Sequence, residues 1–167
     1  MALAVNDAGT IVGYQNGESG GPQAAIFHGD GTFDVLGTLG LEESWAADVN
    51  ESGVIVGRAF GIVEAKLVEK AFVYENGQMR ELHSLLPQES GWEQLIEAAA
   101  INDLGVIVGT GTYQGEVRAF VATPIPEPGT LYLLTSACGL IGLPRGAMRL
   151  LGLEPKTYGL KVRCSTD

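Results

Sequence analysis

The stretch VNDAGTIVG, Val5 to Gly13, decides the fold because it returns as VNESGVIVG, Val49 to Gly57, and as INDLGVIVG, Ile101 to Gly109. Each copy begins with a β-branched residue, Asn, an acidic residue, a variable residue and Gly. An Asn side chain bonds to nearby backbone and Gly accepts positive φ, so this half predicts a turn. The apolar half predicts a short strand buried on both faces, because a half-buried strand would alternate apolar and polar residues.

A second repeated segment lies between the nonapeptides. Its copies are AAIFHGDGTFDVL from Ala24, KAFVYENGQMREL from Lys70 and RAFVA from Arg118. Aligned on Ala25, Ala71 and Ala119, these copies are 46 and 48 residues apart, while the nonapeptides are 44 and 52 apart. Two interleaved markers at about the same period define one supersecondary unit of the size of a propeller blade.

The second unit predicts four short strands, at Trp45 to Val49, Val54 to Val56, Ala71 to Tyr74 and Gln78 to Leu82. The turn Asn50 to Gly53 joins the first two strands, and Asn76-Gly77, a strong hairpin signal, joins the last two. In the first unit Asp30-Gly31 takes the place of that Asn-Gly turn.

These patterns predict an all-β fold of about two and a half four-stranded, β-propeller-like blades, followed by a Pro-rich linker and a short apolar C-terminal helix. The repeat region is 1–122, with units of about 1–40, 41–90 and 91–122, and the third unit stops after its third strand at Val121. A propeller usually needs at least four blades. A fragment of a larger ring, an open stack, and an oligomer that closes the ring are the alternatives. We favour the fragment, because the chain opens within a repeat.

Composition and charge narrow the classes of function and partner to be expected. The 167 residues include 24 Gly, and 20 acidic residues outnumber 10 basic ones, for a net charge of −10. A nucleic-acid partner is not expected, since no basic stripe is present. Both cysteines, Cys138 and Cys164, lie beyond the repeats, so no disulfide framework is expected there. No signal peptide is visible at the N-terminus.

The chain changes character after Ala122. Residues 123–130 hold three prolines within TPIPEPG and predict an extended linker. The run Leu131 to Leu143 carries no charge but has only 13 residues, fewer than the roughly 20 that span a bilayer. Arg145 and Arg149 follow, so 131–150 is an apolar segment with a basic flank. An interfacial or marginally spanning helix and a buried helix remain alternatives, and 151–167 is unassigned.

Several residues are candidates for chemistry. His28 and His83 show no zinc-ligand spacing and are interpreted as solvated turn residues. Glu42, Glu43 and Asp48 are interpreted as solvated charges, because nothing fixes the spacing that a pair of glycosidase carboxylates needs. The Asn-acidic pairs could form a calcium ladder, but turn chemistry is favoured. These pairs are Asn6-Asp7, Asn50-Glu51 and Asn102-Asp103.

Aromatic and glycine residues also have two interpretations. Trp45 and Trp92 could stack on sugars, but packing between blades is favoured. Gly13, Gly57 and Gly109 are interpreted as ending the second strands at a bend or bulge rather than as admitting a ligand. No catalytic residue, cofactor or metal is predicted.

The repeats resemble a known family. LGTLGLEESWAADVNESGVIVG (Leu36 to Gly57) and SLLPQESGWEQLIEAAAINDLGVIVG (Ser84 to Gly109) look like the HAF repeat of bacterial extracellular proteins. That family is named for a His-Ala-Phe triplet. Lys70-Ala71-Phe72 and Arg118-Ala119-Phe120 keep only Ala-Phe, and Gln23, Ala24 and Ala25 diverge further. The resemblance covers about 2–122.

The segment IPEPGTL, Ile125 to Leu131, resembles the PEP-CTERM sorting signal. The resemblance implies that an exosortase-type membrane enzyme recognises Pro126, Glu127 and Pro128 while 131–143 is transiently inserted in the membrane. It further implies an extracellular or surface location on a Gram-negative bacterium. The sequence departs from the family in its thin basic end and in the 18 residues after Arg149.

The leading hypothesis is therefore a non-enzymatic, secreted or surface-displayed β-repeat protein with a structural or adhesive role in the envelope or the exopolysaccharide matrix. Exopolysaccharide and a second copy of the chain are its further expected partners, since an exposed sheet face favours self-association. The alternative is a carbohydrate-binding or glycan-processing propeller whose site lies in missing blades.

Overall fold

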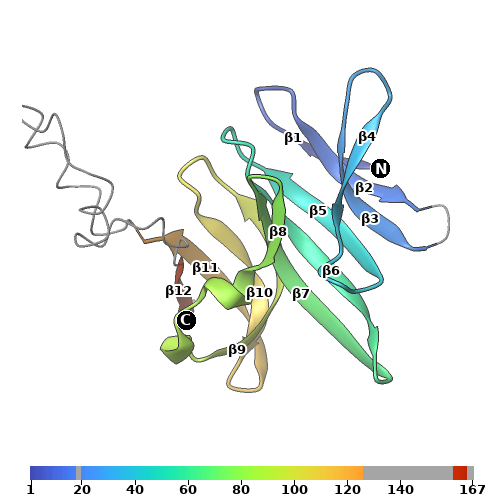
Figure 1. Ribbon diagram of the computed structural model, residues 1–167. Coiled ribbons are helices and arrows are strands. Elements are labelled where there is room, and N and C mark those ends of the chain that lie inside the picture. Colours follow the sequence, from blue (N-terminus) through green and yellow to red (C-terminus); the bar gives the residue numbers. More distant parts are fainter. Residues whose placement is uncertain (18–19, 126–159, 165–167) are drawn as a thin grey trace, which may run out of the picture.

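The computed structural model describes residues 1–17, 20–125 and 160–164 (Figure 1). These residues form three antiparallel four-stranded sheets, so the all-β prediction is confirmed. The linker motif Pro126 to Pro128, the apolar run 131–143 and the expected C-terminal helix lie outside the described residues.

Within each sheet the strands follow one another in chain order. The first sheet contains β1 (Ala2–Val5), β2 (Ile11–Asn16), β3 (Pro22–Phe27) and β4 (Phe33–Gly37). The second contains β5 (Glu43–Val49), β6 (Ile55–Val63), β7 (Lys66–Glu75) and β8 (Gln78–Glu81). The third contains β9 (Trp92–Ile101), β10 (Ile107–Tyr113), β11 (Glu116–Pro124) and β12 (Leu160–Cys164). Two short 3₁₀ turns, η1 (Leu82–Leu85) and η2 (Gln88–Ser90), connect the second sheet to the third.

The predicted turns are present. Gly53 has φ +77° and donates its N–H to the Asn50 carbonyl at 3.0 Å. Asn76 and Gly77 have φ values of 52° and 78°, the paired positive values that a tight hairpin turn needs. The strands that these turns join were predicted too short. β6 continues to Val63 and β7 begins at Lys66, because antiparallel pairing extends well past Gly57.

The third sheet corrects two predictions. β11 continues past Val121 to Pro124, and β12 pairs with it from Phe120 to Pro124. The third unit therefore has a fourth strand. That strand starts 36 residues after β11 ends. It is therefore not joined to β11 by a short hairpin turn that the sequence could have predicted.

Strand pairing also corrects the alignment of the second marker. Gly13 pairs with Ala25, whereas Gly57 pairs with Phe72 and Gly109 with Phe120. The equivalent alanines are therefore Ala24, Ala71 and Ala119, and the alignment on Ala25 was one residue off. A one-residue shift matters because neighbouring residues of a strand point to opposite faces.

The three sheets lie side by side, with the second in the middle (Figure 1). One core forms between the first and second sheets and another between the second and third. The buried residues of the first core are Val12, Ala24, Leu36, Ala46, Val49, Ile55 and Phe72. Those of the second core are Val56, Ala71, Val73, Leu82, Trp92, Leu95, Ala98, Ile101, Ile107, Phe120 and Ala122. Ile55 and Val56 enter different cores, which confirms burial on both faces for the middle copy of the apolar run.

The recurring second glycine makes close packing within each sheet possible. A Cβ on Gly57 would overlap the carbonyl oxygen of Trp45 and lie 2.9 Å from the Phe72 ring. Gly57 pairs with Ala46, next to the β-bulge between Ala46 and Asp48. Gly13 and Gly109 meet a neighbouring carbonyl in the same way. The bulge interpretation is confirmed, but these glycines do not end their strands, since each is the third residue of a longer one.

Candidate functional site

The three Asn turns lie next to one another and form a hydrogen-bonded seam across the sheets. The Asn6 Nδ2 donates to the Asn50 carbonyl at 2.9 Å, and the Asn50 Nδ2 donates to the Asn102 carbonyl at 3.2 Å. These contacts link residues 44 and 52 positions apart. We call the three turns and these contacts the Asn seam.

Each Asn side chain also closes its own turn. Its Oδ1 accepts the backbone N–H four residues on, from Thr10 at 2.8 Å, Val54 at 2.9 Å and Val106 at 2.9 Å. The amide therefore uses its acceptor within the turn and its donor toward the next sheet. Turn chemistry was predicted for the Asn residues and is confirmed, whereas the link between sheets was missed.

The acidic residue after each Asn adds a second link. The Asp7 N–H donates to the Glu51 carboxylate at 2.6 Å, and the Glu51 N–H donates to the Asp103 carboxylate at 3.0 Å. Charge-assisted bonds of this kind are stronger than neutral ones. Recurrence of an acid after every Asn is the signal that could have revealed this role. Within 1–17, 20–125 and 160–164, no group of three or more His, Cys, Asp or Glu side chains could hold a metal ion.

Two further polar side chains, the buried Ser44 and the half-buried Asp48, strengthen the contacts between sheets. The fully buried Ser44 hydroxyl donates to the Gly37 carbonyl at 2.6 Å and accepts the Ala24 N–H at 2.9 Å. Asp48 accepts the Ile101 N–H at 2.8 Å, across to the third sheet. Asp48 is thus a structural residue.

Both tryptophans pack against aromatic neighbours, as the favoured interpretation predicted. Trp45 of the second sheet stacks on Tyr14 of the first with ring centroids 5.4 Å apart, and the Arg58 guanidinium lies 4.5 Å from its ring centre. Trp92 is 6% exposed and meets Phe120 edge to face at 5.9 Å. Both rings are therefore engaged in aromatic packing, and Trp45 also in a contact with a cation.

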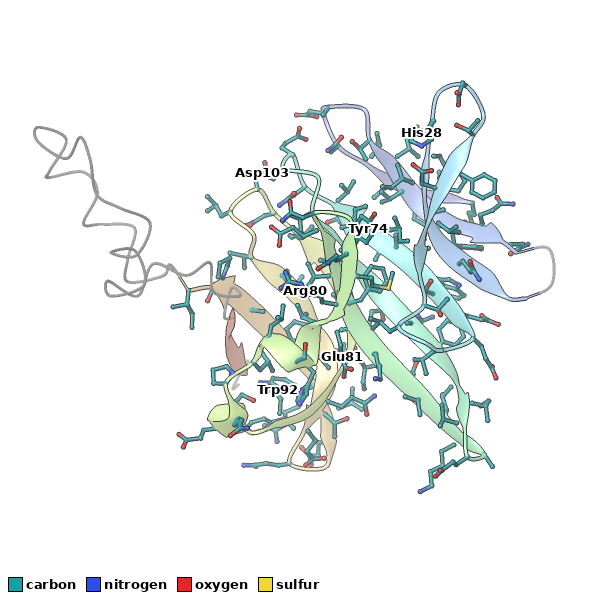
Figure 2. The ribbon with its side chains drawn as sticks, viewed as in Figure 1. His28, Tyr74, Arg80, Glu81, Trp92 and Asp103 are labelled. Carbon is teal, nitrogen blue, oxygen red and sulfur yellow. The ribbon has the colours of Figure 1, made fainter. Side chains whose placement is uncertain are left out.

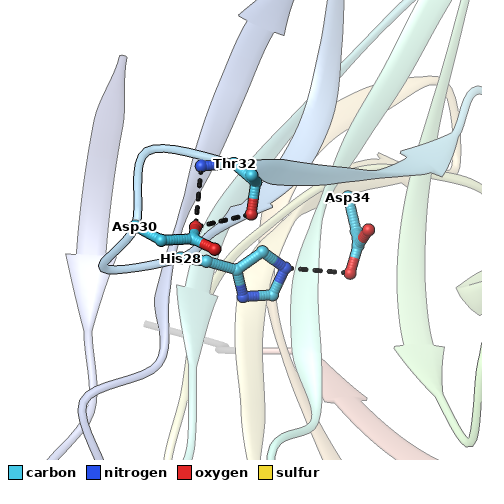
Figure 3. A network of polar contacts seen from close by, with 4 residues as sticks. All are labelled: His28, Asp30, Thr32 and Asp34. Atoms are coloured by element: carbon cyan, nitrogen blue, oxygen red, sulfur yellow. Dashed lines mark hydrogen bonds and ion pairs between the residues drawn. The ribbon is translucent and has the colours of Figure 1, made fainter.

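His28 belongs to a small surface network at the β3–β4 turn (Figure 3). Its Nε2 lies 3.0 Å from the Asp34 Oδ2, and the Asp30 Oδ1 accepts both the hydroxyl and the N–H of Thr32. The Thr32 hydroxyl is the main cause that lowers the pKa of Asp30, and the Thr32 N–H adds to it. His28 is therefore a partly exposed turn residue, as predicted.

His83 differs from its prediction as a solvated residue. It lies in η1 and is half-buried, and its Nδ1 is buried without a hydrogen-bond partner among the described residues. The 3₁₀ turn causes this difference, because it folds back over the second sheet instead of extending β8 into solvent.

A cavity of about 200 Å³ lies where β7 and β8 meet the third sheet, near Arg80 (Figure 2). Its lining is mostly apolar and consists of Val54, Val73, Glu75, Arg80, Leu85, Ile101, Gly105, Ile107 and Pro124. The Arg80 guanidinium is paired with Glu75 at 3.2 Å. Ligand sites usually occupy about 300–1,000 Å³, so this cavity suits at most a small apolar group.

The described part of the chain contains no helix of the length and apolarity that crossing a membrane requires. No curated protein and no solved structure matches the chain. One family matches residues 1–134, which include all three repeat units. The chain belongs to this family, described as a protein of unknown function (DUF3466).

Proposed function

We propose that this chain is a non-enzymatic β-repeat protein with a structural or adhesive role in the bacterial envelope or exopolysaccharide matrix, and that its three sheets are blades of a propeller-type stack. The observation that carries the proposal is the use of the repeated polar residues. The amides of Asn6 and Asn50 and the carboxylates of Glu51 and Asp103 bond to backbone of the same or the neighbouring turn. Residues engaged in this way stabilise the stack, which is what a structural module requires.

Placement at the cell surface rests on the resemblance of Ile125 to Leu131 to a PEP-CTERM sorting signal. An exosortase-type enzyme would recognise Pro126, Glu127 and Pro128 while 131–143 is inserted in the membrane. Processing near the motif would then release the repeat region or attach it at the surface.

Sorting can be tested with Glu127→Ala in a Gram-negative host that has an exosortase-type enzyme, with the chain expressed behind a secretory leader. We expect the variant to keep its unprocessed size and to remain in the membrane fraction. Glu154→Ala changes an acidic tail residue outside the motif and serves as the matched control. A Glu127→Ala product with normal size and location would rule out the sorting signal.

Adhesion can be tested by affinity electrophoresis through gels that contain exopolysaccharide from such a host. We expect the purified chain to be retarded relative to a gel without polysaccharide. Migration that no polysaccharide alters would refute the adhesive role. Polysaccharide hydrolysis that one carboxylate substitution abolishes would instead establish the glycan-processing alternative.

A further inference from the structure

Each sheet has two different apolar faces, and the same residue positions form them in every unit. The forward face packs on the next sheet along the chain and includes Val12, Val56 or Val108, the second apolar residue of each nonapeptide. The rear face packs on the preceding sheet and includes Val5, Val49 or Ile101, the residue before each Asn. Burial of a given position therefore depends on whether a neighbouring sheet is present.

The two ends of the stack leave one face of each kind exposed. On the forward face, Val12 and Val56 are fully buried, whereas Val108 of the third sheet is 40% exposed. On the rear face, Val49 and Ile101 are 5% and 9% exposed, whereas Val5 of the first sheet is 64% exposed.

The exposed rear face of the first sheet keeps the apolar character of the buried ones. Strand pairing places Val5, Ile11, Phe27 and Phe33 in one row across this sheet. The equivalent row of the second sheet is Val49, Ile55, Tyr74 and Met79, and it packs in the core against the first sheet. Val121, 39% exposed, pairs with Val108 and extends the forward patch of the third sheet.

The Asn seam supplies matching polar groups at these two ends. All its links between sheets run in one direction, with each turn donating to the next. Asn102 Nδ2 and the Asp103 N–H are therefore left as donors without partners among the described residues. At the other end, the Asn6 carbonyl accepts only the N–H of Gly9, within its own turn, and the Asp7 carboxylate accepts nothing in the described part of the chain. The donors at one end fit the acceptors at the other.

We propose that the forward face of the third sheet binds the rear face of the first sheet of a second copy, and that two copies close a ring of six sheets through two such contacts. Asn102 and Asp103 then continue the seam onto Asn6 and Asp7 of the partner copy. Propellers contain about four to eight blades, and six is the multiple of three in that range. Head-to-tail contacts of this kind either close a ring or form a fibre. This inference concerns assembly and does not depend on the proposed function.

The experiment uses sedimentation velocity and light scattering on the full 167-residue chain. We expect a particle of twice the 17.5 kDa chain mass at micromolar concentration. Val5→Asp blocks only the rear face and Val108→Asp only the forward face. Each should be monomeric, with association at least about 100-fold weaker, because a carboxylate buried without a partner opposes contact. Ile62→Asp, at a 56% exposed position on the second sheet, is the matched control and should stay dimeric.

Mixing the two monomeric variants distinguishes a head-to-tail contact from a symmetric one. The forward face of Val5→Asp and the rear face of Val108→Asp are intact, so an equimolar mixture should form a dimer with a single contact. Circular dichroism should show both variants folded. A monomeric wild type, a fibre, a dimer of either variant alone, or a mixture that stays monomeric would each overturn the proposal.

Discussion

Replacing Asn50 by Ala tests the Asn seam most directly. Asn50 is 4% exposed and lies in the middle turn. Its side chain accepts the Val54 N–H at 2.9 Å and donates to the Asn102 carbonyl at 3.2 Å. Each of these bonds contributes about 1 kcal/mol net, and a buried N–H left unpaired costs about 1–3 kcal/mol. We therefore expect Asn50→Ala to lower the free energy of unfolding by about 2–4 kcal/mol.

Asn102 provides a matched comparison at the end of the seam. Its Oδ1 accepts the N–H groups of Leu104 and Val106, but both bonds are exposed, and its Nδ2 donates to no described residue. Water can replace exposed bonds, so Asn102→Ala should cost only about 0.5–1 kcal/mol. Asn6→Ala should fall between the two, because its side chain makes a link to the second sheet, as Asn50 does to the third, but is only half-buried.

Urea unfolding followed by circular dichroism measures these differences as shifts of midpoint at constant slope. All three substitutions are made in the Val108→Asp background, so that association of copies does not contribute. Equal effects of Asn50→Ala and Asn102→Ala would refute the reasoning, because only Asn50 combines a buried side chain with a link to the next sheet. A change of slope would indicate that the sheets unfold separately.

Three further predictions concern single sites. Gly57→Ala should lower the free energy of unfolding by roughly 3 kcal/mol, the upper end of the usual cost of overpacking, because the added Cβ overlaps a backbone carbonyl. Gly29→Ala, which has open space around its Cα, should stay within about 0.5 kcal/mol in the same thermal melt. Similar melts for both variants would contradict the close packing. Ser44→Ala should lower the free energy of unfolding in urea by about 1–3 kcal/mol, since it removes the side-chain partner of the buried Ala24 N–H and of the Gly37 carbonyl. An unchanged midpoint would exclude this link. Thr32→Ala should raise the pKa of Asp30 toward its ordinary value in an NMR titration, because the lost hydroxyl is the main cause of the lowering. Because the pKa of Asp30 is lowered in the folded state, its carboxylate stabilises the turn at pH values above the unfolded-state pKa. This contribution is lost as the pH falls through the folded-state pKa. An Asp30 pKa that does not respond to Thr32→Ala would contradict the assigned cause.

The sequence by itself determined the repeating unit and its turns. Asn50, Gly53, Asn76 and Gly77 act through their own backbone, so their effect can be inferred from neighbouring residues alone. The double apolar run Ile55-Val56 also has one physical solution, burial of a strand between two layers. These are local rules, and they predicted four strands in each of the first two units and the stacking of the sheets.

Only the tertiary structure decided the contacts between distant segments. The pairing of β12 with β11, the equivalence of Ala24 with Ala71, and the extension of β6 past Gly57 depend on registers that local chemistry does not set. The same holds for the Asn seam, since a carboxylate such as Glu51 finds its donor 44 residues away. Periodicity reports which residues repeat, but the partner of each hydrogen bond is fixed only when one sheet packs against the next.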